Sequence, residues 1–196
     1  MSLKSKIASQ FSKPGGMGAT LSTALMNFIN TEHYRAVRIY SPKDQGARIL
    51  DVGCGNGYML GLLSRYQGLK LYGVDISFDM VSRAERLGAS VTQASVTDLP
   101  FLDGYFDCVY TINTVYFWED YDKGFQEILR VLTKGGRFIC TFYSVDFMKR
   151  LSYFDDSVRK FQPAELRELV RKAGFKNVKV KILEKDKSFC LIGEKP

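Results

Sequence analysis

The sequence predicts an α/β fold: a doubly wound, mostly parallel sheet of seven strands, with helices on both faces and an antiparallel hairpin strand at its C-terminal end. From residue 47 onward, short apolar runs alternate with amphipathic helical segments, which is the order typical of a parallel sheet. The apolar runs are nearly continuous, as strands are when both faces of a sheet are covered. A chain of 196 residues can form one substantial core, so we expect a single domain over 1–196.

The first 46 residues precede this alternation, and we expect them to form an arm and helices that cap the functional site. Residues 1–17 end in "KPGGMG" and predict an arm. Apolar residues then recur at helical spacing from Ala19 to Asn30, and a second helical piece covers 32–40. The stretch "SPKDQG" ends the helical pattern because proline, glycine and aspartate favour turns.

The alternating region predicts five strands and three helices. Its second helix has Ser77 as N-cap, Asp79 in the first turn and Gly88 as its stop, each a preferred residue type at that position. In chain order the predicted segments are strand 48–53, helix 58–66, strand 70–76, helix 77–88, strands 90–95 and 106–113, helix 122–132 and strand 135–144.

The C-terminal part predicts one more helix and a hairpin. The helix begins at Pro163, which suits the first helical position, and ends at Gly174. Two strands at 177–186 and 188–195 are joined near Asp186 and Lys187. Residues 144–160 form an insertion between the fifth strand and this helix, and we interpret them as a lid.

Composition excludes several classes of protein. No run approaches the roughly 18 apolar residues of a membrane helix, and the basic N-terminal stretch lacks the apolar core of a secretory signal. We therefore expect a cytoplasmic protein with no membrane partner. The chain has one histidine and four scattered cysteines, so we expect buried free thiols, no metal site and no disulfide framework. The cysteines are Cys54, Cys108, Cys140 and Cys190.

The net charge of +7 is concentrated near the C-terminus. Residues 157–196 carry 11 Lys and Arg against 5 Asp and Glu. Such a segment could attract RNA or an acidic partner. The charges alternate with apolar residues instead of forming a block, which favours a solvated face and makes nucleic acid an unlikely partner.

Three glycines, Gly53, Gly55 and Gly57, follow the first apolar run in "ILDVGCGNG". Glycine there lets a ligand approach the backbone closely, although a tight strand-to-helix turn needs the same residues. The dinucleotide-binding pattern requires its third glycine where this chain has Tyr58, and no Gly-Lys-Ser/Thr follows for a phosphate-binding P-loop. The loop therefore favours a ligand without a pyrophosphate.

An acid ends the second predicted strand. The carboxylate of Asp75 has two oxygens and can accept both hydroxyls of a ribose. It also precedes Ser77, so a helix-capping role is the alternative, and the two roles are compatible.

Six stretches together resemble the class I S-adenosylmethionine-dependent methyltransferases of the small-molecule type. They are "ILDVGCGNG", "LYGVDIS", "QASVTDLPF", "FDCVYTINTVYFWED", "EILRVLTKGGRF" and "AELRELVRKAGF", in order over about 130 residues. With "KPGGMG" and "MNFINTEH", the segment "TVYFWED" is similar to a bacterial branch of that family. The resemblance implies a Rossmann-like fold, S-adenosylmethionine as cofactor and S-adenosylhomocysteine as product.

The resemblance also implies a role for each side of the cofactor pocket. Asp51 would lie near the methionine ammonium group, and the glycine loop would face the rest of the methionine part. Ser95 departs from the family pattern, because an acid often meets the adenine amino group there, and Asp98 is an alternative partner. The implied cofactor-binding residues are Asp51, Gly53, Gly55, Asn56 and Gly57 for the methionine part, Asp75 for the ribose, Ile76, Met80, Ser95 and Val96 for the adenine, and Asn113 at the end of the fourth strand.

The expected reaction is methyl transfer to a small-molecule acceptor by in-line displacement. The protein then mainly holds the acceptor in line, so a general base is needed only if the acceptor must lose a proton. No catalytic residue can be assigned. Aromatic residues near the strand ends favour an apolar or aromatic acceptor, although they are also compatible with a core. The candidate catalytic residues are Tyr116, Trp118, Glu119, Tyr143 and His33, although a surface position on a helix is the favoured interpretation of His33.

Three alternatives stay open. A methyltransferase for RNA or another macromolecule is disfavoured because no Asn/Asp-Pro-Pro-Tyr follows the fourth strand. A non-catalytic S-adenosylmethionine-binding protein is also compatible with the sequence, because motifs are recognised for binding the cofactor but not for binding an acceptor. An NAD-linked oxidoreductase is disfavoured by the missing third glycine. The oligomeric state is not predicted.

Overall fold

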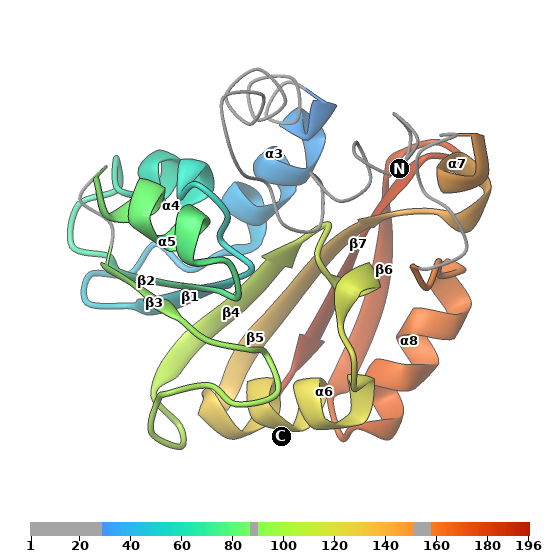
Figure 1. The fold of residues 1–196 in the computed structure, drawn as a ribbon. Coiled ribbons are helices and arrows are strands. Elements are labelled where there is room, and N and C mark those ends of the chain that lie inside the picture. The colour runs from blue at the N-terminus through green and yellow to red at the C-terminus, as the bar shows by residue number, and fades with distance from the viewer. Residues whose placement is uncertain (1–28, 87–89, 151–157) are drawn as a thin grey trace.

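The structure is a computed structural model that describes residues 29–86, 90–150 and 158–196, and these form a seven-stranded sheet in the order β3-β2-β1-β4-β5-β7-β6 (Figure 1). Only β7 is antiparallel to its neighbours β5 and β6, so the predicted fold class is confirmed. The strands are β1 (Arg48–Val52), β2 (Lys70–Asp75), β3 (Ser90–Gln93), β4 (Phe106–Ile112), β5 (Leu132–Tyr143), β6 (Lys176–Glu184) and β7 (Ser188–Glu194).

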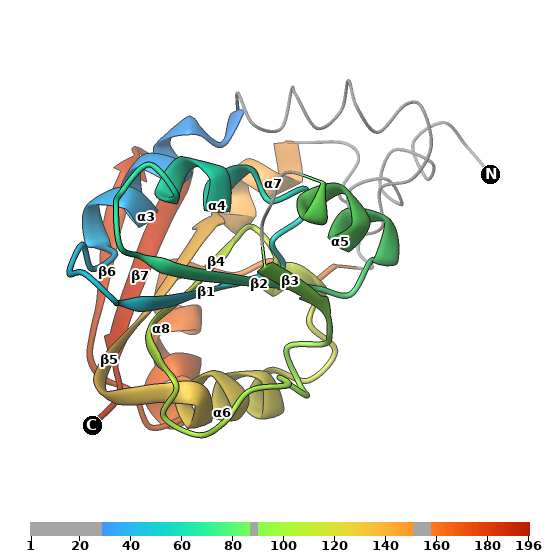
Figure 2. The same cartoon turned by 90° about the vertical axis from the view of Figure 1, so that its left-hand side faces the viewer.

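Helices cover both faces of the sheet. Helices α3, α4 and α5 lie on one face, and α6 and α8 lie on the other (Figures 1 and 2). The helices are α3 (Thr31–Tyr40), α4 (Tyr58–Leu63), α5 (Phe78–Glu85), the 3₁₀ helix η1 (Val115–Phe117), α6 (Tyr121–Val131), α7 (Val145–Arg150) and α8 (Pro163–Lys172). Within the described residues, no helix has the length and apolar character needed to span a membrane.

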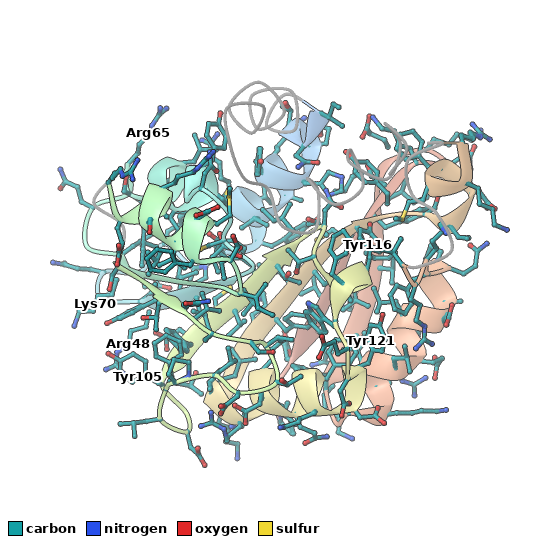
Figure 3. The ribbon with its side chains drawn as sticks, viewed as in Figure 1. Arg48, Arg65, Lys70, Tyr105, Tyr116 and Tyr121 are labelled. Carbon is teal, nitrogen blue, oxygen red and sulfur yellow. The ribbon has the colours of Figure 1, made fainter. Side chains whose placement is uncertain are left out.

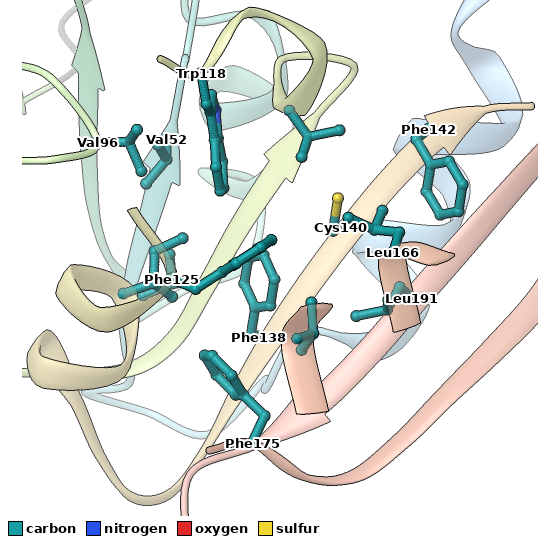
Figure 4. Packing of buried hydrophobic residues seen from close by; sticks show 14 of the residues in the cluster. Val52, Val96, Trp118, Phe125, Phe138, Cys140, Phe142, Leu166, Phe175 and Leu191 are labelled. Carbon is teal, nitrogen blue, oxygen red and sulfur yellow. The ribbon is translucent and has the colours of Figure 1, made fainter. Parts of the chain in front are cut away.

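Alternate residues of the central strands enter two separate cores. In β1, Ile49 packs with the core under α3 and α4, whereas Leu50 packs with the core under α6 and α8. Figure 4 shows the second core, where Phe125 of α6 and Phe138 of β5 have ring centroids 6.1 Å apart. Side chains alternate across a strand, so burial on both faces explains why the strands are apolar along their whole length.

Several boundaries differ from the sequence prediction by one to three residues, for example those of α4 and β5. Helix α4 ends at Leu63, earlier than predicted. Strand β5 begins at Leu132, before the glycine pair predicted to start it. The glycines stay in the strand because Gly135 N–H donates to the Lys195 carbonyl and Lys195 N–H donates to the Gly136 carbonyl, both at 2.9 Å.

Some sequence predictions lie outside the described residues. These are the N-terminal arm, the first helix up to residue 28, the stop at Gly88, and residues 151–157 of the proposed lid. The predicted hairpin turn is confirmed, since Asp186 has φ of 57° between β6 and β7. All four cysteines are free and buried, as expected.

Candidate functional site

A pocket with a cavity volume of about 230 Å³ opens at the carboxyl ends of β1, β2 and β4. Ligands bind at this edge in open α/β sheets. Of the residues predicted to bind a cofactor, only Gly57 is absent from its lining. The predicted residues that line the pocket are Asp51, Gly53, Gly55, Asn56, Asp75, Ile76, Met80, Ser95, Val96 and Asn113.

The floor of the pocket is the glycine turn between β1 and α4. The N–H groups of Gly53 and Cys54 both donate to the Val74 carbonyl, at 2.8 and 3.0 Å, which holds the turn against β2. Gly53 has φ of 77°, and a Cβ built on it would lie 2.4 Å from Thr114 Cγ2. Glycine is therefore required there both for the backbone conformation and for the close approach of Thr114.

Asp75 connects the glycine turn to the start of α5. Its Oδ2 accepts from Gly55 N–H at 2.8 Å, and its Oδ1 accepts from Ser77 N–H at 2.9 Å. This one carboxylate therefore braces the glycine turn and the start of α5. It also lines the pocket, and its predicted contact with a ribose stays a prediction. Burial raises the pKa of Asp75, while the two backbone donors lower it. Each oxygen keeps acceptor capacity for a further donor.

Asp51 lies under the glycine turn with only 2% of its surface exposed. Burial, with a smaller contribution from the Asp75 charge, raises the pKa of Asp51 to about 8, although the Tyr110 hydroxyl opposes this rise. Among the described residues, no Lys, Arg or His forms an ion pair with it. A buried carboxylate without a cation is suited to a ligand that brings its own positive charge.

Asp51→Asn is expected to flatten the pH dependence of stability. Because the pKa of Asp51 in the folded protein, about 8, lies above the unfolded value of about 3.9, the folded state binds more protons between these values. Wild-type stability therefore falls as pH rises from about 4 to about 8, by about 1.4 kcal/mol per unit of pKa difference. Urea unfolding at pH 5.5 and 8.5 would measure this, with exposed Asp79→Asn as control. Equal pH slopes for wild type and Asp51→Asn would contradict the assignment.

Hydrogen bonds tie α3 to the far side of the pocket. Asn113, which directly follows β4 and has φ of 56°, donates its side-chain amide to Asn30 Oδ1 at 2.8 Å. The Tyr143 hydroxyl donates to the same oxygen at 3.1 Å. Asn30 therefore joins the start of α3 to the ends of β4 and β5.

The candidate catalytic residues separate into two groups. Trp118 and Glu119 line the pocket. Tyr116 lies just past the tip of β4 (Figure 3), buried, with its hydroxyl donating to Asn113 Oδ1 at 3.3 Å. Tyr143 is likewise buried and does not line the pocket. Both tyrosines therefore lie behind the residues that form the pocket wall.

His33 is neither a surface residue nor part of the pocket lining. It is fully buried, and its ring packs edge-on against Tyr143 with centroids 4.6 Å apart. Burial, with a smaller contribution from Lys187, lowers its pKa to about 3. Neither ring nitrogen has a hydrogen-bond partner among the described residues. The surface interpretation was wrong, because the apolar side of α3 packs on β5, β6 and β7.

Asp98, the alternative adenine partner, does not line the pocket, whereas Ser95 does. The Ser95 hydroxyl lies 2.9 Å from the Thr97 hydroxyl and accepts from Thr97 N–H at 3.2 Å. Ser95 therefore shapes the loop after β3 as well as the pocket wall.

Sequence patterns missed the pocket residues Asn30, Tyr34 and Thr114. Asn30 and Asn113 are 83 positions apart, and no local spacing signals such a contact. The sequence offered one local signal for Asn30: asparagine is a preferred N-cap residue, and Asn30 directly precedes α3.

Similar proteins share one type of domain. The sequence profile of a methyltransferase domain matches residues 50–140. The chain is 29% identical over 161 residues to the uncharacterised methyltransferase YdaC of Bacillus subtilis, covering 78% of this chain and 85% of that protein. It is 34% identical over 153 residues to an uncharacterised protein of Methanocaldococcus jannaschii, covering 74% and 70%.

Solved structures share the fold. A possible histamine N-methyltransferase from Thermotoga maritima, described as S-adenosylmethionine-dependent, matches with a TM-score of 0.75 at 24% identity, covering 90% of this chain and 96% of that one.

Proposed function

Because this chain belongs to the class I S-adenosylmethionine-dependent methyltransferases, we propose that it transfers a methyl group from S-adenosylmethionine to a small-molecule acceptor by in-line displacement. The observation that carries the proposal is the pocket at the carboxyl ends of β1, β2 and β4, where a glycine turn lies between two carboxylates.

The residues of this pocket fit each part of the cofactor. Asp51 is buried and has no ion-pair partner among the described residues, which suits a ligand ammonium group. Asp75 keeps acceptor capacity for the two ribose hydroxyls, while Met80 and Val96 offer apolar surface to the adenine. Asn113, held by Asn30, borders the side where the methyl group would point. Gly57 helps to form the turn that presents these groups.

When bound, S-adenosylmethionine supplies an electrophilic methyl group: the acceptor lone pair bonds to its carbon as the carbon–sulfur bond breaks, and that electron pair leaves with sulfur in a neutral thioether. The chain's own contribution is to hold the acceptor atom about 3 Å from this carbon and in line with the breaking bond. Hydrogen bonds among Asn30, Asn113 and Tyr143 hold one wall of the pocket in place. No residue of the chain is assigned as a general base.

Aromatic residues in the lining support an apolar or aromatic skeleton for the acceptor. Tyr34, Phe117 and Trp118 line the pocket beside its polar groups. We propose further that residues 1–46 cap the site, since Asn30 and Tyr34 of this segment already line it. A cytoplasmic location in a bacterium remains the prediction from sequence.

Calorimetry and a turnover assay test the proposal together. S-adenosylmethionine and S-adenosylhomocysteine are expected to bind the purified protein, and NADH is not. Incubation with S-adenosylmethionine and a panel of small molecules and RNA is expected to release S-adenosylhomocysteine with small molecules. Failure of both sulfur compounds to bind would refute the proposal. Release with RNA alone would establish the macromolecular alternative, and binding without release from any acceptor would favour a non-catalytic binder.

A further inference from the structure

The charge of the pocket is opposite to that of the chain. Three acids, Asp51, Asp75 and Glu119, line the pocket, and among the described residues its lining contains no Lys, Arg or His. The chain as a whole carries a net charge of +7. Acidic side chains are therefore present in the described lining and basic side chains are not, although the chain as a whole has more basic than acidic residues.

The cations of the strands that build the pocket lie at the opposite end of the sheet. Arg48 begins β1 and is paired in register with Lys70, which begins β2, whereas Asp51 and Asp75 lie at or next to the carboxyl ends of the same strands. Figure 3 shows Arg48 and Lys70 together at the edge of the molecule, where the Arg48 guanidinium lies 4.6 Å from the centroid of the Tyr105 ring. In β1 and β2, positive and negative charges are thus segregated along the strand.

None of the three pocket acids is neutralised by the described part of the chain. No ion pair involves Asp51, Asp75 or Glu119 there. Asp75 accepts only backbone N–H groups. No cation of the described residues therefore competes with a ligand for these acids. Because burial raises the pKa of Asp51 to about 8, the charge on this residue forms when a cationic group binds beside it.

The cofactor of the proposed function neutralises only part of this charge. It carries an ammonium and a sulfonium against one carboxylate, which leaves one net positive charge to set against three acids. An acceptor with a carboxylate or phosphate would be desolvated beside like charges, and no cation of the described lining could pair with it. A cationic acceptor would bring the pocket closer to neutrality.

The aromatic part of the lining points to the same ligand chemistry. Tyr34, Phe117 and Trp118 line the pocket together with Glu119. A cation over an aromatic face is attracted by the ring, and acids among aromatic rings are a common arrangement for ammonium ligands. This observation is independent of the charge count.

We infer that the methyl acceptor carries a basic amine and no carboxylate or phosphate group, with Glu119 as a residue that selects for this charge. The amine binds as an ammonium ion. Where its nitrogen is the methylated atom, the ammonium first gives its proton to water, and the freed lone pair then attacks the methyl carbon. The inference rests on the proposed function, because it assigns Asp51 and Asp75 to the cofactor and leaves Glu119 for the acceptor. Glu119 is exposed, so its own contribution is modest, and the selectivity comes from the whole lining.

The test uses matched ligands that differ only in charge. Benzyl, indole-ethyl and hexyl skeletons, each as amine, alcohol and carboxylate, are titrated by calorimetry into the full-length protein loaded with S-adenosylhomocysteine. Each is also incubated with S-adenosylmethionine, and methylated product is measured by mass spectrometry. On at least one skeleton, the amine is expected to bind about tenfold or more tightly than the carboxylate, with an advantage that shrinks as salt is added.

Glu119→Gln isolates the contribution of one pocket charge. This variant is expected to weaken amine binding by about twofold to fivefold, while binding of the matched alcohol and of S-adenosylhomocysteine stays unchanged. Asp122→Asn is the matched control, because it removes an exposed acid of α6 that does not line the pocket. It is expected to leave the preference for amines unchanged.

Two outcomes would overturn the inference while leaving the proposed function intact. One is that carboxylates bind as tightly as amines, or are the ones methylated. The other is that no amine binds to protein that does bind S-adenosylhomocysteine. Failure to bind S-adenosylhomocysteine at all would instead refute the proposed function.

Discussion

Replacing Asp75 with alanine is expected to weaken binding of S-adenosylhomocysteine by at least about 100-fold, or about 2.7 kcal/mol. In the proposed complex, the variant would lack the hydrogen bonds from the ribose hydroxyls to the Asp75 carboxylate, and hydrogen bonds to a charged group contribute about 1.5–3 kcal/mol each. The substitution would also remove the acceptor for Gly55 N–H and Ser77 N–H, so the glycine turn would lose its hydrogen bond to the end of β2. Calorimetric titration of the folded variant measures the change.

Two further variants separate the carboxylate from its surroundings. Asp79→Ala removes an exposed acid in the first turn of α5 and is expected to bind like the wild type. Asp75→Asn keeps the side-chain shape but turns an NH₂ group toward one of the two backbone donors, so it is expected to bind nearly as weakly as Asp75→Ala. Equal affinity of Asp75→Ala and Asp79→Ala would remove Asp75 from the site.

Gly53→Ala is expected to lower the free energy of unfolding by about 2–5 kcal/mol. Two costs combine, because the residue has φ of 77° and its new Cβ would lie 2.4 Å from Thr114 Cγ2. Urea unfolding measures the loss, and calorimetry with S-adenosylhomocysteine shows how far the displaced turn still binds.

The neighbouring glycine supplies a matched control. Gly55 has φ of 53°, but a Cβ there would meet nothing within 4 Å. Gly55→Ala is therefore expected to cost only the backbone term, about 1–2 kcal/mol. Adding Thr114→Ser to Gly53→Ala removes the closest methyl group and is expected to recover about 1 kcal/mol. An equal loss of stability in the two single variants would show that Thr114 does not constrain the turn.

Local patterns were enough to predict the sheet and one side of the pocket. The run that ends at Val52 and the acid at Asp75 each lie at a strand end, and parallel strands bring their carboxyl ends to one edge. Glycine spacing located the turn but could not separate its residues by role. Gly57 has φ of 78° at the start of α4 and lies outside the pocket lining, so its contribution to binding remains a prediction.

The opposite wall of the pocket could not be predicted in the same way. Asn30 meets Asn113 only because α3 packs across the ends of β4 and β5, a tertiary contact with no local spacing. His33 was misjudged for a related reason. A polar residue on a short helix usually faces water, but here that side of α3 lies on the sheet and buries the imidazole without a hydrogen bond to the described residues.

The position of β7 has a consequence for how the polypeptide acquires its shape during translation. The last strand of the sheet to emerge from the ribosome is inserted between β5 and β6, which are both made before it. Until β7 is made, β6 has no partner strand in the sheet, and the hydrogen-bonding edge of β5 is open to other chains. The nascent protein therefore passes through a stage at which it is prone to aggregate, and the sheet is closed only by its final strand.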